Sequence, residues 1–189
     1  PVDEFVACVR ALVEVEKNWV PLEKGEALYI RPLIFASEQH IAVRAATTYT
    51  FVIMAGPAEP YFASGRSKLR LKAEGRYTRA AAGGTGAAKT SGNYAGTLKP
   101  MAEAITEGFD QILWLDGQTH RFAEEAGQMN VFFRIGDEVV TPELSGTILP
   151  GVTRDTVIQL LSDWGYTVST RQVSIQELKS ASDAGLLIE

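Results

Sequence analysis

The segment Gln111-Ile112-Leu113-Trp114-Leu115-Asp116-Gly117 predicts a buried strand that ends in a tight turn, because an apolar run leads directly into an Asp-Gly pair. Residues 120–125 and 129–135 also have the composition of strands, and Val139-Val140 continues the pattern beyond Gly136-Asp137. Successive strands joined by short turns pair antiparallel. We therefore expect a meander in the second half of the chain.

Helices are expected beside this meander. Apolar residues recur at spacings of three and four over residues 94–107 and 153–164, and Thr153 can cap the second helix. Ser174 and Glu177 have the spacing of a capping box, which predicts a short helix after them.

The amino-terminal part of the chain has a separate pattern. Residues 2–19 predict an amphipathic helix, and residues 27–35 and 47–55 predict strands, the second of them buried. The pattern weakens beyond these strands, so we expect two domains, residues 1–80 and residues 81–189.

The composition is that of a globular protein and excludes several classes of function. Of the 189 residues, 46% are hydrophobic and 22% are charged, which is too apolar for a disordered chain. The net charge of −5 argues against nucleic acid as a partner. Cys8 is the only cysteine, and His40 and His120 lie far apart, so neither a disulfide framework nor a metal site is expected. Without an apolar run of about 18 residues or a signal-peptide pattern, we expect no membrane association and a cytoplasmic location.

The glycine-rich loop at residues 83–90 is open to two interpretations. Gly83, Lys89 and Thr90 match the phosphate-binding loop of nucleotide-binding proteins. However, Ala88 replaces the second glycine of that loop, and the residues before the loop are a poor buried strand. The other interpretation starts from the residues that follow the lysine.

Four phrases after the lysine form a specific set. They are SGNYAG at residues 91–96, GFDQILWLDG at 108–117, EAGQMNVFF at 125–133 and LSGTILPGVTR at 144–154, and LYIRP at 28–32 is a fifth, upstream. Together they resemble the branched-chain amino acid aminotransferases, which are pyridoxal 5′-phosphate-dependent enzymes of fold-type IV, the fold of D-amino acid aminotransferase.

The resemblance implies a two-domain α+β enzyme that is incomplete at its N- and C-termini. Residues 1–80 would be the C-terminal part of the small α/β domain. Residues 81–189 would be the N-terminal part of the large cofactor-binding domain.

The resemblance also assigns the groups that act on the cofactor ring. Lys89 would be the catalytic lysine, whose amine forms an imine with the cofactor aldehyde and then moves a proton between substrate and cofactor. Tyr94 would bind the phenolate oxygen of the cofactor. Glu125 would face the ring nitrogen and keep it protonated, so that the ring withdraws electrons. Glu124 competes for this role, but the Glu-x-Gly-x-Met-Asn register selects Glu125.

The remaining assignments concern the phosphate and the substrate. Val152 and Thr153 would offer backbone amides to the cofactor phosphate at a helix amino terminus, and Leu149 would pack against the ring. Tyr29 and Arg31 resemble positions of the substrate pocket, where Arg31 could pair with the side-chain carboxylate of glutamate. Taken alone, each of these residues also fits a purely structural role.

The activity implied by the resemblance is amino transfer between leucine, isoleucine or valine and 2-oxoglutarate, carried out by a homodimer. A D-amino acid transaminase or an aminodeoxychorismate lyase would reuse the same lysine and glutamate. Two alternatives belong to other functional classes. One is a nucleotide-binding protein, and the other is an inactive fragment that acts as an interaction module.

Overall fold

The computed structural model describes residues 1–59 and 68–188, which belong to two compact units. Unit 1 is Pro1–Ser67 and unit 2 is Lys68–Glu189. The sequence places the boundary near residue 80. Residues 68–80 instead group with unit 2, because the strand Leu71–Glu74 pairs with the strand Gln111–Leu115. The identity of the units as small and large domains stays a prediction.

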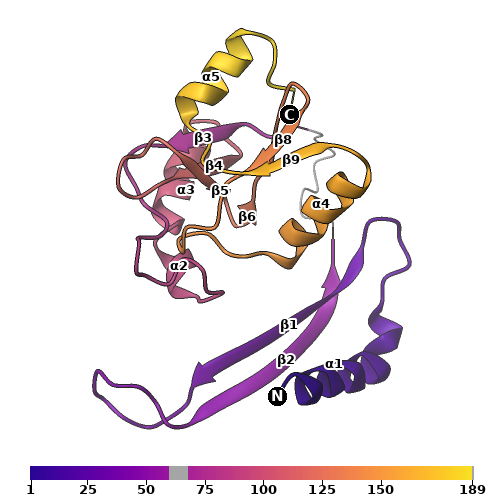
Figure 1. The fold of residues 1–189 in the computed structure, drawn as a ribbon. Helices are drawn as coiled ribbons and strands as arrows, with labels where there is room; N and C mark the ends of the chain where they lie inside the picture. The colour runs from indigo at the N-terminus through magenta and orange to yellow at the C-terminus, as the bar shows by residue number, and fades with distance from the viewer. Residues whose placement is uncertain (60–67, 189) are drawn as a thin grey trace. The chain divides into compact units, whose positions relative to one another are not determined.

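Unit 1 is a long hairpin with a helix against it (Figure 1). Its elements are α1 (Val2–Glu16), the short 3₁₀ helix η1 (Lys17–Trp19), β1 (Ala27–Ala36) and β2 (Tyr49–Ala58). The expected helix and both strands are confirmed, and β1 pairs antiparallel with β2 along its whole length. Pro32 lies within β1, which has β2 as its only partner among the described residues and is therefore an edge strand, where proline is tolerated.

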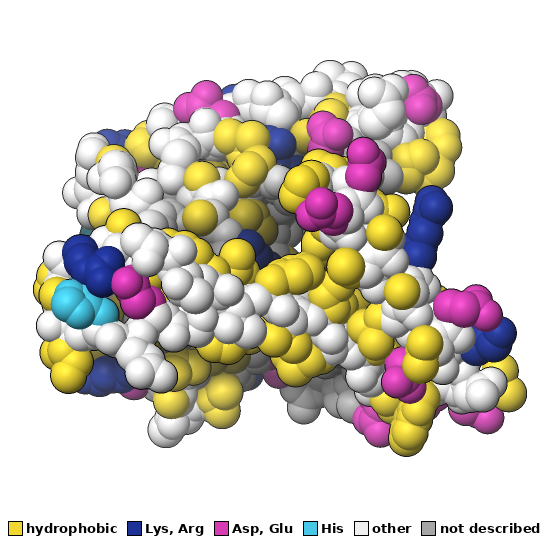
Figure 2. All heavy atoms as spheres, turned by 90° about the horizontal axis from the view of Figure 1, so that it is seen from below, with side chains coloured by type: hydrophobic (Ala, Val, Ile, Leu, Met, Phe, Trp, Pro, Cys, Tyr) yellow, Lys and Arg dark blue, Asp and Glu magenta, His cyan; other side chains and the backbone are white. Residues whose placement is uncertain are grey.

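The prediction that the second strand of unit 1 is buried is wrong. Every residue of β2 is exposed or half-buried, because a two-stranded sheet with a single helix cannot enclose it. The face seen in Figure 2 shows hydrophobic side chains gathered along the hairpin. The exposed large hydrophobic residues of the two strands are Tyr29, Leu33, Ile34, Phe35, Tyr49, Phe51 and Met54.

Unit 2 contains two small sheets. The first has the order β3 (Leu71–Glu74), β4 (Gln111–Leu115), β5 (Ala123–Ala126) and β6 (Met129–Asn130). The second consists of β7 (Phe133–Ile135), β8 (Glu138–Thr141) and β9 (Thr167–Thr170). The antiparallel succession β4–β5–β6 confirms the expected meander over that part. The single strand expected over residues 129–135 is divided, because the chain leaves the first sheet after Asn130 and joins the second.

The loop between β4 and β5 explains why β5 begins later than expected. The Asp116 carboxylate accepts hydrogen bonds from the backbone N–H groups of Thr119, Arg121 and Phe122. His120 has a φ of 51°, in the left-handed region. The residues expected to start the strand therefore form a closed turn.

The described residues of unit 2 also form four helices, namely α2 (Gly92–Ala95), α3 (Leu98–Thr106), α4 (Val152–Asp163) and α5 (Ile175–Asp183). The single helix expected over residues 94–107 is divided between α2 and α3, with Pro100 in the first turn of α3, where its missing N–H costs little. Thr153 does not cap α4, because the cap position is Gly151, which has extended backbone. No helix among the described residues is long and apolar enough to cross a membrane.

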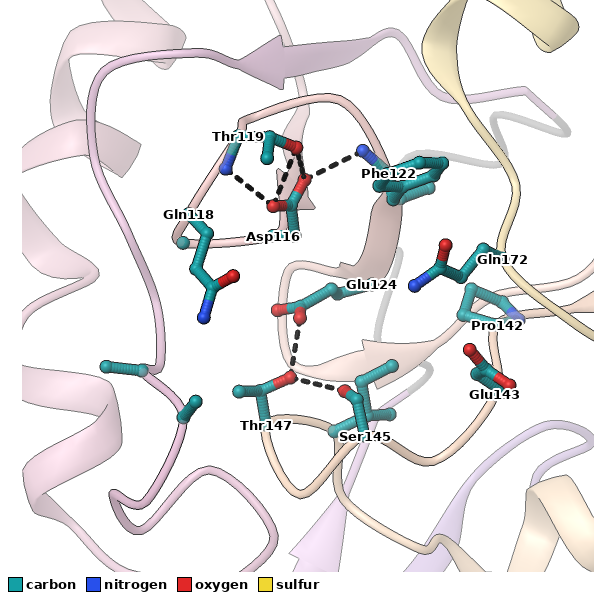
Figure 3. Close-up of a pocket in the computed structure, with 15 residues that line it drawn as sticks. Asp116, Gln118, Thr119, Phe122, Glu124, Pro142, Glu143, Ser145, Thr147 and Gln172 are labelled. Atoms are coloured by element: carbon teal, nitrogen blue, oxygen red, sulfur yellow. Dashed lines mark hydrogen bonds between the residues drawn. The ribbon is translucent and has the colours of Figure 1, made fainter.

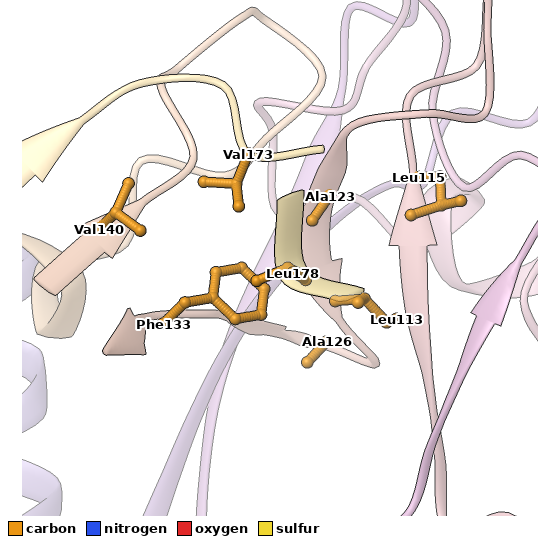
Figure 4. Packing of buried hydrophobic residues seen from close by; sticks show 8 residues of the cluster. All are labelled: Leu113, Leu115, Ala123, Ala126, Phe133, Val140, Val173 and Leu178. Atoms are coloured by element: carbon orange, nitrogen blue, oxygen red, sulfur yellow. The ribbon is translucent and has the colours of Figure 1, made fainter. Parts of the chain in front are cut away.

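The larger hydrophobic cluster of unit 2 lies between its sheets and α5 (Figure 4), and a smaller one joins α3 to β4. The buried residues of the larger cluster come from both sheets, from α5 and from the segment before α5: Leu113, Leu115, Ala123, Ala126, Phe133, Val140, Val173 and Leu178. This packing makes β4 and β5 the rigid support for the residues that follow them.

The capping residue of α5 supports a first testable prediction. Ser174 Oγ accepts a hydrogen bond of 3.0 Å from the Glu177 N–H, as the capping box predicts. We expect Ser174→Ala to lower the free energy of unfolding by about 1 kcal/mol, because an amide at the helix start loses its partner. Urea unfolding followed by circular dichroism measures this change. Ser182→Ala, at an exposed position in the last turn, is the matched control and should change stability by less than about 0.5 kcal/mol.

Candidate active site

A cavity of about 540 Å³ in unit 2 brings together residues from three parts of the chain. They are contributed by the loop before α2, by the β5–β6 hairpin with the residues after it, and by the turn that begins α4. The lining residues are Lys89, Glu125, Gln128, Met129, Asn130, Phe132, Leu149, Gly151, Val152, Thr153, Arg154 and Val157. Five of the eight residues singled out by the sequence therefore line one cavity.

Lys89 lies in a loop whose shape is fixed by a buried amide. The Asn93 side chain donates hydrogen bonds to the Thr85 and Ala88 carbonyl oxygens, at 2.7 and 2.9 Å. Lys89 itself is exposed, and its Nζ lies 5.5 Å from the centroid of the Tyr94 ring. Tyr94 thus neighbours the lysine, although it is not among the residues that line the cavity.

The side chains of the two adjacent glutamates of β5 lie on opposite faces of the strand. Glu125 lines the cavity that contains Lys89, whereas Glu124 lines a second cavity of about 480 Å³. In that second cavity the Glu124 carboxylate accepts a hydrogen bond from the Thr147 hydroxyl (Figure 3). The Thr147 hydroxyl is also hydrogen-bonded to the Ser145 hydroxyl. Side chains alternate along a strand, so only one of the two glutamates can face Lys89.

Arg79 is a site residue that the sequence analysis missed. Its Nη2 lies 3.3 Å from Glu125 Oε1, and the side chains of the two residues are 5% and 4% exposed. The same nitrogen donates to the Thr147 and Gly86 carbonyl oxygens. Burial raises the pKa of the Glu125 carboxyl, while its hydrogen bond from Leu149 and the charges of Arg79 and Lys89 oppose that rise. Arg79 stands ten residues before Lys89 in a weakly patterned segment, which gave no signal.

The turn before α4 is attached to the same hairpin by two hydrogen bonds. The Leu149 N–H donates to Glu125 Oε1 at 2.8 Å, and Asn130 Nδ2 donates to the Leu149 carbonyl oxygen at 2.9 Å. Val152 and Thr153 follow as the first two residues of α4, where backbone N–H groups have no partner within the helix. Asn130 was not singled out by the sequence analysis beyond its place in the family phrase.

Tyr29 and Arg31 belong to unit 1. Arg31 Nη2 donates a hydrogen bond of 2.7 Å to the Tyr29 hydroxyl, and its guanidinium carbon lies 5.0 Å from the centroid of the Tyr29 ring. Both residues are on β1. Their role in substrate binding stays a prediction.

The nucleotide-binding interpretation of the glycine-rich loop is not supported by the local topology. That motif needs a strand directly before the loop and a long helix after it. Here β3 ends at Glu74, well before Gly83, and α2 has only four residues. The strand β4, which ends just before Asp116, pairs antiparallel with β5, so Asp116 belongs to a hairpin connection and not to a parallel crossover.

The family model described as amino-transferase class IV matches residues 5–187. This chain belongs to the class IV aminotransferases. Similar members of the class include branched-chain-amino-acid transaminase 1 of Bacillus subtilis, 46% identical over 192 residues, and the branched-chain-amino-acid aminotransferase of Mycobacterium tuberculosis, 46% identical over 190 residues. These alignments cover 100% and 98% of this chain but 54% and 52% of the relatives. The chain thus spans about half the length of the curated relatives it matches.

Solved class IV aminotransferases share the fold. The branched-chain enzyme of Thermobaculum terrenum, in its pyridoxal-phosphate form, is 25% identical with a TM-score of 0.75, over 94% of this chain and 55% of that one. The Escherichia coli enzyme, 24% identical, has a TM-score of 0.76 over 99% of this chain and 58% of that one. The expected α+β fold of fold-type IV is therefore confirmed.

Proposed function

We propose that this chain carries the lysine and the ring-binding groups of a pyridoxal 5′-phosphate-dependent branched-chain amino acid transaminase. The observation that carries the proposal is the shared cavity of Lys89, Glu125 and the first turn of α4. The three groups match the three parts of the cofactor: an amine for the aldehyde, a carboxylate for the ring nitrogen and unpaired N–H groups for the phosphate.

The residues have distinct parts in this mechanism. When bound, the cofactor supplies an electron-withdrawing ring that stabilises negative charge at the substrate Cα. Lys89 is the one amine among the lining residues, so Lys89 Nζ would be the group that takes up and returns the proton of the substrate Cα. Glu125, which lies 3.3 Å from Arg79, would face the ring nitrogen. Val152 and Thr153 would hold the phosphate through backbone amides, Leu149 would pack against the ring, and Tyr94 would bind the phenolate oxygen.

The substrate class follows from the relatives. Several proteins that match nearly all of this chain, at 42–46% identity, are named branched-chain-amino-acid transaminases or aminotransferases. We therefore propose leucine, isoleucine or valine as amino donors and 2-oxoglutarate as acceptor, with Tyr29 and Arg31 in the substrate pocket. Transamination assays with L- and D-amino acids test this against a D-amino acid transaminase.

We also propose that two copies of the chain associate as a homodimer. The apolar side chains exposed along β1 and β2 support this, because exposed apolar patches commonly mark association surfaces. Sedimentation at several concentrations should give twice the monomer mass. A monomer at all concentrations would contradict this part of the proposal.

Covalent trapping tests the proposed function directly. The purified chain is mixed with pyridoxal 5′-phosphate, reduced with borohydride, digested and analysed by mass spectrometry. We expect one modified peptide, with the cofactor on Lys89. Modification spread over the surface lysines, with no preference for Lys89, would rule the proposal out.

A further inference from the structure

Two side chains of the β5–β6 hairpin form hydrogen bonds with the backbone of Leu149. Glu125 and Asn130 are direct cross-strand partners in the hairpin. Glu125 Oε1 accepts from the Leu149 N–H at 2.8 Å, and Asn130 Nδ2 donates to the Leu149 carbonyl oxygen at 2.9 Å. Both backbone polar groups of Leu149 are therefore fixed by a pair of neighbouring side chains.

Asn130 also fills the space beside Gly151, the residue just before α4. A Cβ atom built on Gly151 would lie 2.2 Å from Asn130 Oδ1, which is far inside van der Waals contact. The backbone of Gly151, with φ −68° and ψ 134°, is open to any residue. A side chain at position 151 would therefore have to displace the Asn130 amide, although the backbone conformation itself would accept one.

We propose that Asn130 is a positioning residue, which through Leu149 and Gly151 holds the first turn of α4 at a fixed place relative to Glu125. The inference rests on the proposed function, since it concerns the spacing between the carboxylate for the cofactor ring and the amides for its phosphate. A rigid ligand is bound well only when both ends of its site are held at the matching distance.

The amide of asparagine suits this role better than the side chain of aspartate or alanine would. Asn130 uses its N–H₂ group as donor to the Leu149 carbonyl while its oxygen faces Gly151. An aspartate would turn a charged acceptor toward that carbonyl, and an alanine would leave the carbonyl with only the Gly151 N–H, at 2.8 Å. Either change removes the hydrogen bond by which Asn130 holds the turn.

Two ligands that differ only in the phosphate provide the test. Dissociation constants of the 189-residue chain for pyridoxal 5′-phosphate and for pyridoxal are compared in the wild type, in Asn130→Ala and in Asn130→Asp. We expect both variants to lose about tenfold more affinity for pyridoxal 5′-phosphate than for pyridoxal, which is the effect of about one lost hydrogen bond to a charged group. Equal losses for both ligands would indicate a merely structural role and overturn the proposal. Asn18→Ala, in η1 of unit 1, is the control.

A second measurement needs no cofactor and so separates this inference from the proposed function. Inorganic phosphate is titrated into ¹⁵N-labelled chain, and the amide shifts of Val152 and Thr153 give its affinity. We expect Gly151→Ala to weaken phosphate binding at least fivefold when Asn130 is present. In the Asn130→Ala background the same substitution should weaken it less than twofold, because the amide that clashes with the new side chain is absent. Additive effects, or no phosphate response at these amides in the wild type, would overturn the inference. Failure of Lys89 trapping alone would overturn only the proposed function.

Discussion

Lys89→Arg should abolish covalent trapping of pyridoxal 5′-phosphate while leaving the fold intact. Arginine preserves the positive charge near the Tyr94 ring and near Glu125, so the electrostatics of the cavity change little. However, a guanidinium stays protonated at any accessible pH and offers no amine to the cofactor aldehyde. The substitution therefore separates the nucleophile from the charge, which Lys89→Ala does not.

The measurements are borohydride trapping and thermal unfolding. We expect no trapped cofactor at residue 89 and, in any assembly competent for transamination, a rate lower by at least about 10²–10⁴-fold, the usual contribution of a positioned acid–base group. Because Lys89 is exposed, the unfolding free energy of the Lys89→Arg variant should differ from that of the wild type by less than about 0.5 kcal/mol. Lys99→Arg, on α3, is the matched control and should trap as the wild type does. Undiminished trapping in Lys89→Arg would assign the amine to another lysine.

The sequence was a reliable guide where the signal is local. The apolar run before Asp116 predicts β4 and its turn, and the Ser174 capping box predicts the start of α5, because each depends on neighbouring residues only. The single helix expected over residues 94–107 is two helices in the structure, because α2 ends before Gly96 and α3 begins at Leu98. Periodicity does not detect such a short break.

The candidate site divides in the same way. The Glu-x-Gly-x-Met-Asn register of the family phrase selects Glu125 over Glu124, and of these two residues only Glu125 lines the cavity that contains Lys89. Arg79 and Asn130 could not be found in this manner, because their roles depend on partners distant in sequence. A buried arginine in a segment without a clear pattern looks like a surface residue until the fold brings a carboxylate to it.

Arg79→Met should be the most destabilising change at the site. The pair with Glu125 is almost fully buried, and removal of one partner leaves an uncompensated charge in a low-dielectric interior. Such losses cost about 3–5 kcal/mol, and here the Thr147 and Gly86 carbonyl oxygens also lose a donor. Urea unfolding measures the cost. Lys99→Met, which breaks the exposed contact of 3.9 Å with Glu103, is the control and should cost less than about 1 kcal/mol.

The pH dependence of this loss identifies its cause. Burial raises the pKa of Glu125 above the usual 4.5, and the charge of Arg79 is one of the effects that oppose the rise, so the pKa should rise further in Arg79→Met. A carboxyl with a raised pKa binds its proton more readily in the native than in the unfolded state. Stability therefore falls as the pH increases from the unfolded pKa toward the native one, and it recovers on acidification. We expect the deficit of Arg79→Met to be smaller at pH 5 than at pH 7, and the double variant Arg79→Met/Glu125→Gln to lose this pH dependence. A deficit that is the same at both pH values would instead point to the lost carbonyl contacts, with Glu125 already neutral in the wild type.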